Sequence, residues 1–116
     1  MGGSAVRSAE KRLATYGTLA PGRINHDQLS GLSGHWYTGQ VFGTLVEAGW
    51  GAEHGYPGLI IDPAGAAIEV YVFESPELPG HWPRLDEFEG PGYRRVVTTV
   101  ATSDGDVEAS IYAISD

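Results

Sequence analysis

The chain has 116 residues, a formal net charge of −8 and no cysteine. This length suits one domain with a modest core. The lack of cysteine excludes disulfides, thiolate nucleophiles and zinc sites built from cysteine. The acidic balance argues against a nucleic-acid partner, whose phosphates need a basic surface. No apolar run is long enough to span a membrane, so no membrane partner is expected.

The first residues, 1–11, have no apolar signal-peptide core, and we expect them to form a flexible leader. Residues 12–116 show no repeat and no linker and are expected to form a single domain. The 17 glycines and 7 prolines are spread along the chain, which indicates turns in a β-rich domain. The absence of cysteine fits a cytoplasmic protein, and the sequence leaves the oligomeric state open.

A strand candidate from Leu13 to Thr18 runs into the loop Tyr16-Gly17-Thr18-Leu19-Ala20-Pro21-Gly22. Two glycines and a proline expose backbone amides, which can hold an anion. A tight turn that leads to the next helix is the alternative. That helix is expected from Asn25 to Leu32, with Asn25 as its N-cap.

The apolar and β-branched residues beyond this point predict a series of short strands. The first runs from His35 to Glu47, where Gly39 and Gly43 indicate a bulge or a bend. A loop from Ala48 to Gly58 follows. The remaining strand candidates are Leu59–Ile61, Ala67–Phe73, Tyr93–Thr102 and Val107–Ile114, with turns at Asp62–Gly65 and Ser103–Asp106. The pattern predicts an α+β fold with a curled or barrel-like sheet.

The segment from His81 to Arg95 contains the one definite helix. Pro83 suits a first helical turn, and Gly90 with Pro91 would end the helix.

Helical spacing places Leu85, Phe88 and Glu89 on one face and turns Asp86 and Glu87 away from it. A carboxylate beside an apolar face loses solvent, which raises its pKa and makes it a better base. Glu89 is therefore the candidate general acid/base. The alternative is that it only lines the edge of the core and reaches water.

Other chemistries find little support in these residues. There is no Gly-x-Ser-x-Gly nucleophile motif, and no cofactor is expected. A metal site is not expected either, because the histidines show no ligand spacing: His26, His35, His54 and His81. A pair of catalytic carboxylates would need a second inward acid, for which Glu69 and Glu74 are candidates, although strand residues of this kind usually face solvent. One acid beside an amide-rich loop suits a substrate that carries its own nucleophile.

The loop beginning Tyr16-Gly17-Thr18-Leu19 resembles the Tyr-Gly-Ser/Thr-Leu signature of the gamma-glutamylcyclotransferase-like superfamily. Three further segments match in the family's order: Tyr56-Pro57-Gly58, Glu69-Val70-Tyr71, and Leu85-Asp86-Glu87-Phe88-Glu89-Gly90 followed by Tyr93 and Arg94. The matches cover roughly residues 13 to 114. Asn25-His26 after the loop also looks like the branch that acts on gamma-glutamylamines.

The resemblance implies a small mixed β-barrel with short flanking helices and a cavity for a gamma-glutamyl conjugate. It implies that Glu89 is the general acid/base of a cyclisation that yields 5-oxoproline and a free amine. It also implies that the substrate-binding residues are Tyr16, Gly17, Thr18, Leu19 and Tyr93. Ala20 departs from the pattern, since a basic residue is common there.

A non-catalytic small-molecule binding module on the same fold is the alternative reading, because fold does not guarantee activity. A third reading is a protein-interaction domain that uses a sheet edge. It would be favoured if side chains filled the cavity.

Overall fold

The computed structural model describes residues 9–16, 29, 31–47, 57–89 and 93–114. In chain order, these contain β1 (Arg12–Thr15), β2 (His35–Glu47), β3 (Pro57–Ile61), β4 (Ala66–Glu74), α2 (Leu78–Glu89), β5 (Tyr93–Thr102) and β6 (Gly105–Ile114). Within this part of the chain, no helix is long and apolar enough to cross a membrane.

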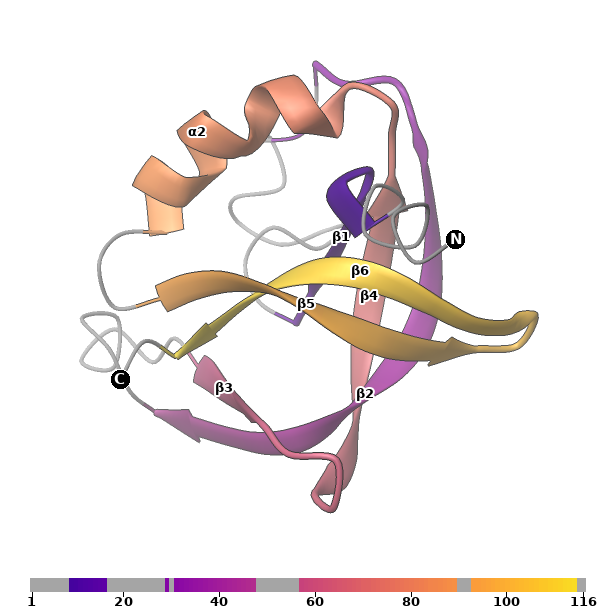
Figure 1. The fold of residues 1–116 in the computed structure, drawn as a ribbon, viewed down its shortest axis with the longest axis vertical. Helices are drawn as coiled ribbons and strands as arrows, with labels where there is room; N and C mark the ends of the chain where they lie inside the picture. The colour runs from indigo at the N-terminus through magenta and orange to yellow at the C-terminus, as the bar shows by residue number, and fades with distance from the viewer. Residues whose placement is uncertain (1–8, 17–28, 30, 48–56, 90–92, 115–116) are drawn as a thin grey trace.

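Five of the described strands close into a barrel (Figure 1). Neighbours follow the order β2, β4, β1, β6 and β5, and β5 returns to β2 at the pair Gln40–Ala101. The β1–β6 pair is parallel, whereas the other pairs are antiparallel. A side chain at Gly39 would lie 2.9 Å from the Ala101 carbonyl, so glycine allows this close return. The architecture confirms the predicted α+β class with a small mixed barrel.

The long strand β2 serves two antiparallel partners in turn. β4 pairs with its first part as far as Gly43, and β3 pairs with the part from Gly43 onward. The turn between β3 and β4 lies at this junction, where the Gly65 amide donates to the Asp62 carbonyl at 2.8 Å. A side chain at Gly43 would clash with the Ile60 backbone carbonyl. The bend predicted at Gly43 is therefore built from backbones in direct contact.

Apolar side chains form two clusters, one inside the barrel and one between the barrel and α2. Strand alternation separates them, because Val70 and Val72 point inward while Phe73 faces the helix. The buried residues of the inner cluster are Ala14, Val41, Leu59, Val70, Val72, Val100, Ala109 and Ile111. Those of the outer cluster are Leu13, Leu29, Phe73, Leu78, Trp82, Leu85 and Tyr112. The helix thus covers an apolar outer face of the barrel (Figure 1).

Helix α2 begins earlier than the sequence predicted. It starts at Leu78, so Pro83 lies in the helix interior rather than in the first turn. An interior proline lacks the N–H for one helical hydrogen bond, but the early turns bury Leu78 fully and Trp82 to 4 % exposure. Burial of these two large side chains favours the longer helix over the local preference of proline. The predicted end is confirmed, since the last helical residue is Glu89.

The β5–β6 hairpin follows the predicted turn closely. Its last pair joins Thr102 to Gly105, which leaves Ser103 and Asp104 as the connecting residues. Gly105 has a φ of +113°, a conformation that residues with a side chain rarely adopt. β6 therefore begins at Gly105, two residues before the predicted start at Val107.

Part of the range predicted as a leader packs on the barrel. Ala9 is fully buried, and its carbonyl accepts a hydrogen bond from the Ser110 hydroxyl at 2.9 Å. The Lys11 carbonyl accepts another from the Ser75 amide at 2.8 Å. Residues 1–8 lie outside the described residues, as does most of the predicted helix over 25–32.

Candidate active site

The residues singled out by the family resemblance follow β1, end α2 and begin β5 (Figure 1). Tyr16 comes directly after β1, Glu89 is the last residue of α2, and Tyr93 is the first residue of β5. The Glu89 side chain and the whole of Gly17–Leu19 lie outside the described residues. The expected approach of that carboxylate to the loop amides therefore stays a prediction.

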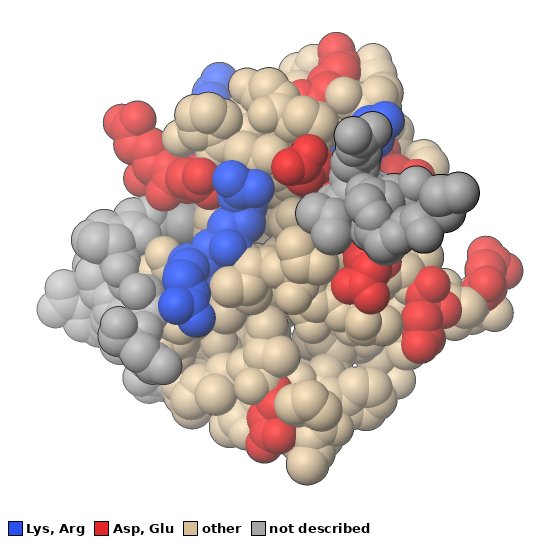
Figure 2. Space-filling model, in the orientation of Figure 1, with Lys and Arg blue, Asp and Glu red and all other residues tan. Residues whose placement is uncertain are grey.

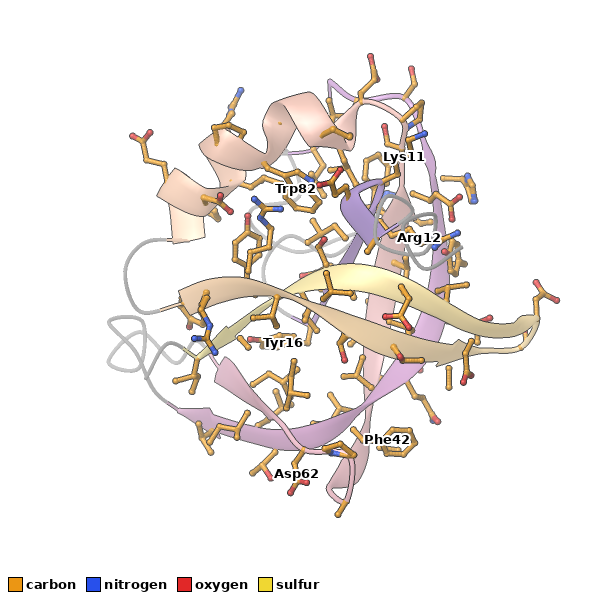
Figure 3. All side chains as sticks on the ribbon, viewed as in Figure 1. Lys11, Arg12, Tyr16, Phe42, Asp62 and Trp82 are labelled. Atoms are coloured by element: carbon orange, nitrogen blue, oxygen red, sulfur yellow. The ribbon has the colours of Figure 1, made fainter. Side chains whose placement is uncertain are left out.

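Tyr16 ties together two strands that form no ladder with each other in the described part of the chain. Its ring lies between β3 and β6 (Figure 3). The hydroxyl donates a hydrogen bond to the Tyr112 carbonyl of β6 at 2.6 Å and accepts one from the Leu59 amide of β3 at 3.0 Å. Because Leu59 is fully buried, its amide needs such a partner. The Tyr16 hydroxyl thus has a structural role that the sequence did not predict.

Replacing Tyr16 by Phe should destabilise the domain by about 2–6 kcal/mol, since an amide and a carbonyl each lose a partner at roughly 1–3 kcal/mol. Urea unfolding measures this change. Tyr71→Phe is the matched control, because Tyr71 is a half-buried tyrosine with no hydroxyl hydrogen bond to another described residue. Equal unfolding free energies for the two variants would show that the tie contributes nothing.

Tyr93 lies where α2, β5 and β3 come together. It is half-buried and packs, together with Phe88, against the outer apolar cluster. Its ring also faces β3, because its Cε1 atom lies 3.7 Å from the point where a side chain on Gly58 would begin. Tyr93 therefore stands close to the end of the helix that carries Glu89.

A polar network that the sequence did not predict joins α2 to β5 and β6. The Nε and Nη2 atoms of Arg95 donate to the two carboxylate oxygens of Asp86 at 3.0 and 3.2 Å. The Tyr112 hydroxyl donates to Asp86 Oδ1 at 2.6 Å. The Arg95 guanidinium also lies over the Trp82 ring, 4.5 Å from its centre. We call these four residues the Asp86 network.

Asp86 was expected to point away from the core, and its side chain is indeed 45 % exposed. Burial raises its pKa, but hydrogen bonds from Arg95 and Tyr112 and the charge of Arg95 outweigh this effect and leave the pKa below its ordinary value. Opposite charges on both sides of the helix–strand junction were the only signal of this pair in the sequence.

Glu74, a candidate second carboxylate, belongs to a similar network at Arg12, the first residue of β1. Its Oε1 atom accepts hydrogen bonds from Arg12 Nε at 3.1 Å and from the Tyr37 hydroxyl at 2.8 Å. Burial raises the pKa of Glu74, yet the bonds from Tyr37 and Arg12 leave it lowered. Burial, helped by the bond to Glu74, raises the pKa of Tyr37 to about 12. We call these three residues the Glu74 network. Glu69, the other candidate, is exposed.

The unfolding free energy should decrease in acid, because Glu74 and Asp86 have pKa values below their ordinary ones in the folded state. Above the ordinary pKa both acids are charged whether the chain is folded or not, and their stabilising bonds are complete. As the pH falls through the folded-state pKa values, the unfolded chain takes up protons first and stability is lost. The loss should be modest, since the two side chains are 35 % and 45 % exposed.

The double variant Glu74→Gln/Asp86→Asn checks this expectation. Urea unfolding from about pH 6 to about pH 3 should give a shallower loss of stability for the variant than for the parent. Parallel curves would show that other carboxylates cause the acid sensitivity.

Charge is unevenly distributed near the end of the helix. On the face shown in Figure 2, Lys and Arg side chains gather below α2 over the start of β5, where the sequence reads Tyr93-Arg94-Arg95.

An open depression of about 360 Å³ lies beside the Glu74 network. It is lined by Lys11, Ser33, Gly34, His35, Glu74, Ser75 and Pro76. This depression does not adjoin the candidate site, since Lys11, which lines the depression, and Tyr16 stand well apart in Figure 3. In the described ranges, no three histidine or acidic side chains are placed to hold a metal.

These features define a class of protein: a small mixed barrel with the helix α2 across its outer face and a glutamate at the end of that helix. A family model described as gamma-glutamyl cyclotransferase, AIG2-like, matches residues 13–116. The chain belongs to this family, which confirms the resemblance seen in the motifs. No curated protein sequence matches the chain.

Solved structures with the same fold include YkqA from Bacillus subtilis, which is 28 % identical with a TM-score of 0.70. That match covers 90 % of this chain and 35 % of YkqA, so the chain spans about a third of that protein. An AIG2-like protein from Mus musculus is 25 % identical with a TM-score of 0.70, over 90 % of this chain and 77 % of the mouse chain. An uncharacterized protein from Pyrococcus horikoshii, 24 % identical with a TM-score of 0.62 over 90 % and 78 % of the two chains, shares the fold.

Proposed function

We propose that this protein is a cyclotransferase that converts a gamma-glutamyl amide or amine into 5-oxoproline and a free amine. The observation that carries the proposal is the family match across residues 13–116, together with the position of Glu89 at the end of α2. Glu89 is the general acid/base of the proposed reaction.

The substrate supplies its own nucleophile in this reaction. Glu89 takes a proton from the α-ammonium group, and the freed amine nitrogen attacks the γ-carbonyl carbon to close a five-membered ring. The bond between that carbon and the leaving nitrogen then breaks as Glu89 returns its proton to that nitrogen. The ring nitrogen gives up its second proton, and the released amine takes it up, so the products are neutral at the ring nitrogen and cationic at the free amine. No water is consumed. Attack within one molecule gains from a held geometry, which a binding site only needs to maintain.

The proposed binding groups are the amides of Gly17, Thr18 and Leu19, which would hold the oxyanion of the tetrahedral intermediate. Tyr16 would contribute through its main chain, because its hydroxyl bonds to β3 and β6. Tyr93 would form a wall beside the helix end. Arg94, which is exposed at the start of β5, suits a substrate that carries a carboxylate. The Arg95 guanidinium is already paired with Asp86.

The test is to incubate the protein with gamma-glutamyl dipeptides and gamma-glutamylamines and to measure 5-oxoproline by mass spectrometry. A matched set of substrates with an acetylated α-amine is the control, since an acetylated nitrogen cannot attack. Reactions run in ¹⁸O-labelled water separate cyclisation from hydrolysis, because cyclisation places no solvent oxygen in the product.

The proposal predicts unlabelled 5-oxoproline from at least one substrate and none from its acetylated partner. Labelled glutamate would instead identify a hydrolase. Saturable binding of these substrates without turnover would establish the alternative, a non-catalytic binding module.

A further inference from the structure

We infer that Asp86, Arg95 and Tyr112 are positioning residues that hold the C-terminal end of α2 in the place that the reaction requires of Glu89. The inference rests on the proposed function for its catalytic consequence. Its structural part, control of the helix end, can be tested without any activity.

The Asp86 network joins α2, which ends at Glu89, to β5, the next described element of the chain. Asp86 lies one helical turn before Glu89 in α2. Arg95 is the third residue of β5, the strand that follows the helix. The two-armed bond between Asp86 and Arg95 therefore connects both sides of the junction. Tyr112 fixes the same carboxylate to β6, so the helix end is held to two neighbouring strands of the barrel.

Packing restrains the network further. Arg95 lies over the Trp82 ring, and that ring meets Tyr112 edge-on with 6.4 Å between centres. The indole N–H of Trp82 donates to the Glu10 carbonyl at 2.9 Å. The guanidinium thus has a fixed ring on one side and a two-armed carboxylate at its edge, a geometry that lysine cannot reproduce.

We expect the Asp86 network to affect the position of the helix end more than the free energy of folding. Its ion pair is partly solvated, with 30 % and 45 % of the two side chains exposed, and such pairs add little to the free energy of folding. By contrast, a displacement of about 1 Å at a catalytic group can cost roughly 10²-fold in rate. Loss of one bond to Asp86 should therefore change turnover more than it changes unfolding.

The chain contains a matched control in the Glu74 network. Both networks join an arginine and a tyrosine hydroxyl to one carboxylate oxygen, and both are partly exposed. Tyr37→Phe and Tyr112→Phe each remove one hydroxyl from such a carboxylate and leave the ring in place. A purely structural role predicts similar effects for the two variants, whereas a positioning role predicts a loss of turnover for Tyr112→Phe alone.

The first measurement is hydrogen exchange of the amides at residues 86–89 and 93–95 in the full chain. Tyr112→Phe should increase exchange there by about tenfold relative to the parent, and Tyr37→Phe should leave these amides unchanged. The second measurement is steady-state formation of 5-oxoproline. Tyr112→Phe should lower kcat by about 10- to 100-fold with KM changed less than about threefold, while Tyr37→Phe keeps both values. Arg95→Lys, at the exposed edge of the network, should lower kcat in the same direction and provides the test if Tyr112→Phe does not fold.

The outcomes separate the two proposals. A parent protein that forms no 5-oxoproline refutes the proposed function, and exchange alone then decides the inference about the helix end. Unchanged exchange at residues 86–89 in both Tyr112→Phe and Arg95→Lys refutes that inference. Equal losses of kcat in Tyr112→Phe and Tyr37→Phe also refute it, because a shared loss reflects stability rather than position.

Discussion

Turnover of a gamma-glutamyl substrate should fall by a factor on the order of 10²–10⁴ when Glu89 is replaced by Gln. The amide has nearly the same shape as the carboxylate, but it can neither take the proton from the ammonium group nor return one to the leaving amine. KM should change much less than kcat, because the proposed binding groups are the amides of Gly17–Leu19. Rates of 5-oxoproline formation across a range of substrate concentrations measure both values.

Glu87→Gln is the matched control for this experiment. Glu87 is exposed on the same helix, two residues earlier, and carries the same charge. Its replacement should leave kcat within about twofold of the parent. Thermal melts of both variants confirm that they are folded. A folded Glu89→Gln variant with full activity would remove Glu89 from the mechanism.

Gly43→Ala should destabilise the domain by about 3 kcal/mol or more, the largest effect on folding that we expect from one added methyl group. The new carbon would clash with the Ile60 carbonyl and would lie 3.0 Å from the Leu59 side chain. The Ile60 carbonyl is backbone, which cannot rotate aside as a flexible side chain can. The bend of β2 and the junction of its two ladders would have to shift.

Gly80→Ala provides a control of opposite sign. Gly80 lies in α2 with open space where a side chain would begin. Alanine favours helix over glycine by up to about 1 kcal/mol, so this variant should be as stable as the parent or more stable. Urea unfolding at neutral pH measures both changes. A Gly43→Ala variant as stable as the parent would show that the bend tolerates a side chain.

Several elements could be predicted from local pattern alone. β2 and β5 have the bounds expected from their β-branched and aromatic residues, His35–Glu47 and Tyr93–Thr102. The end of α2 at Glu89 follows from the glycine and proline after it. In each case the signal lies within a few residues of the element, and tertiary packing agrees with it.

The predicted start of α2 was wrong because the true start depends on contacts with distant residues. Pro83 by itself favours a first turn, but Leu78 and Trp82 bury their side chains against the barrel and extend the helix toward its N-terminus. The role of the Tyr16 hydroxyl was also invisible. Its partners are Leu59 and Tyr112, which come 43 and 96 positions later in the chain, and no local pattern indicates them.

Strand alternation, helix stops and family motifs are read from neighbouring residues, and they predicted the kind of fold, most of its strands and the glutamate at the end of its helix. The way in which that helix end is held depends instead on contacts between distant elements. Asp86 and Arg95 become partners when β5 lies beneath α2, and Tyr112 joins them because β6 pairs with β5. Hydrogen bonds between side chains depend on distances of a few tenths of an ångström, and these are set by the packing of whole elements rather than by spacing along the chain.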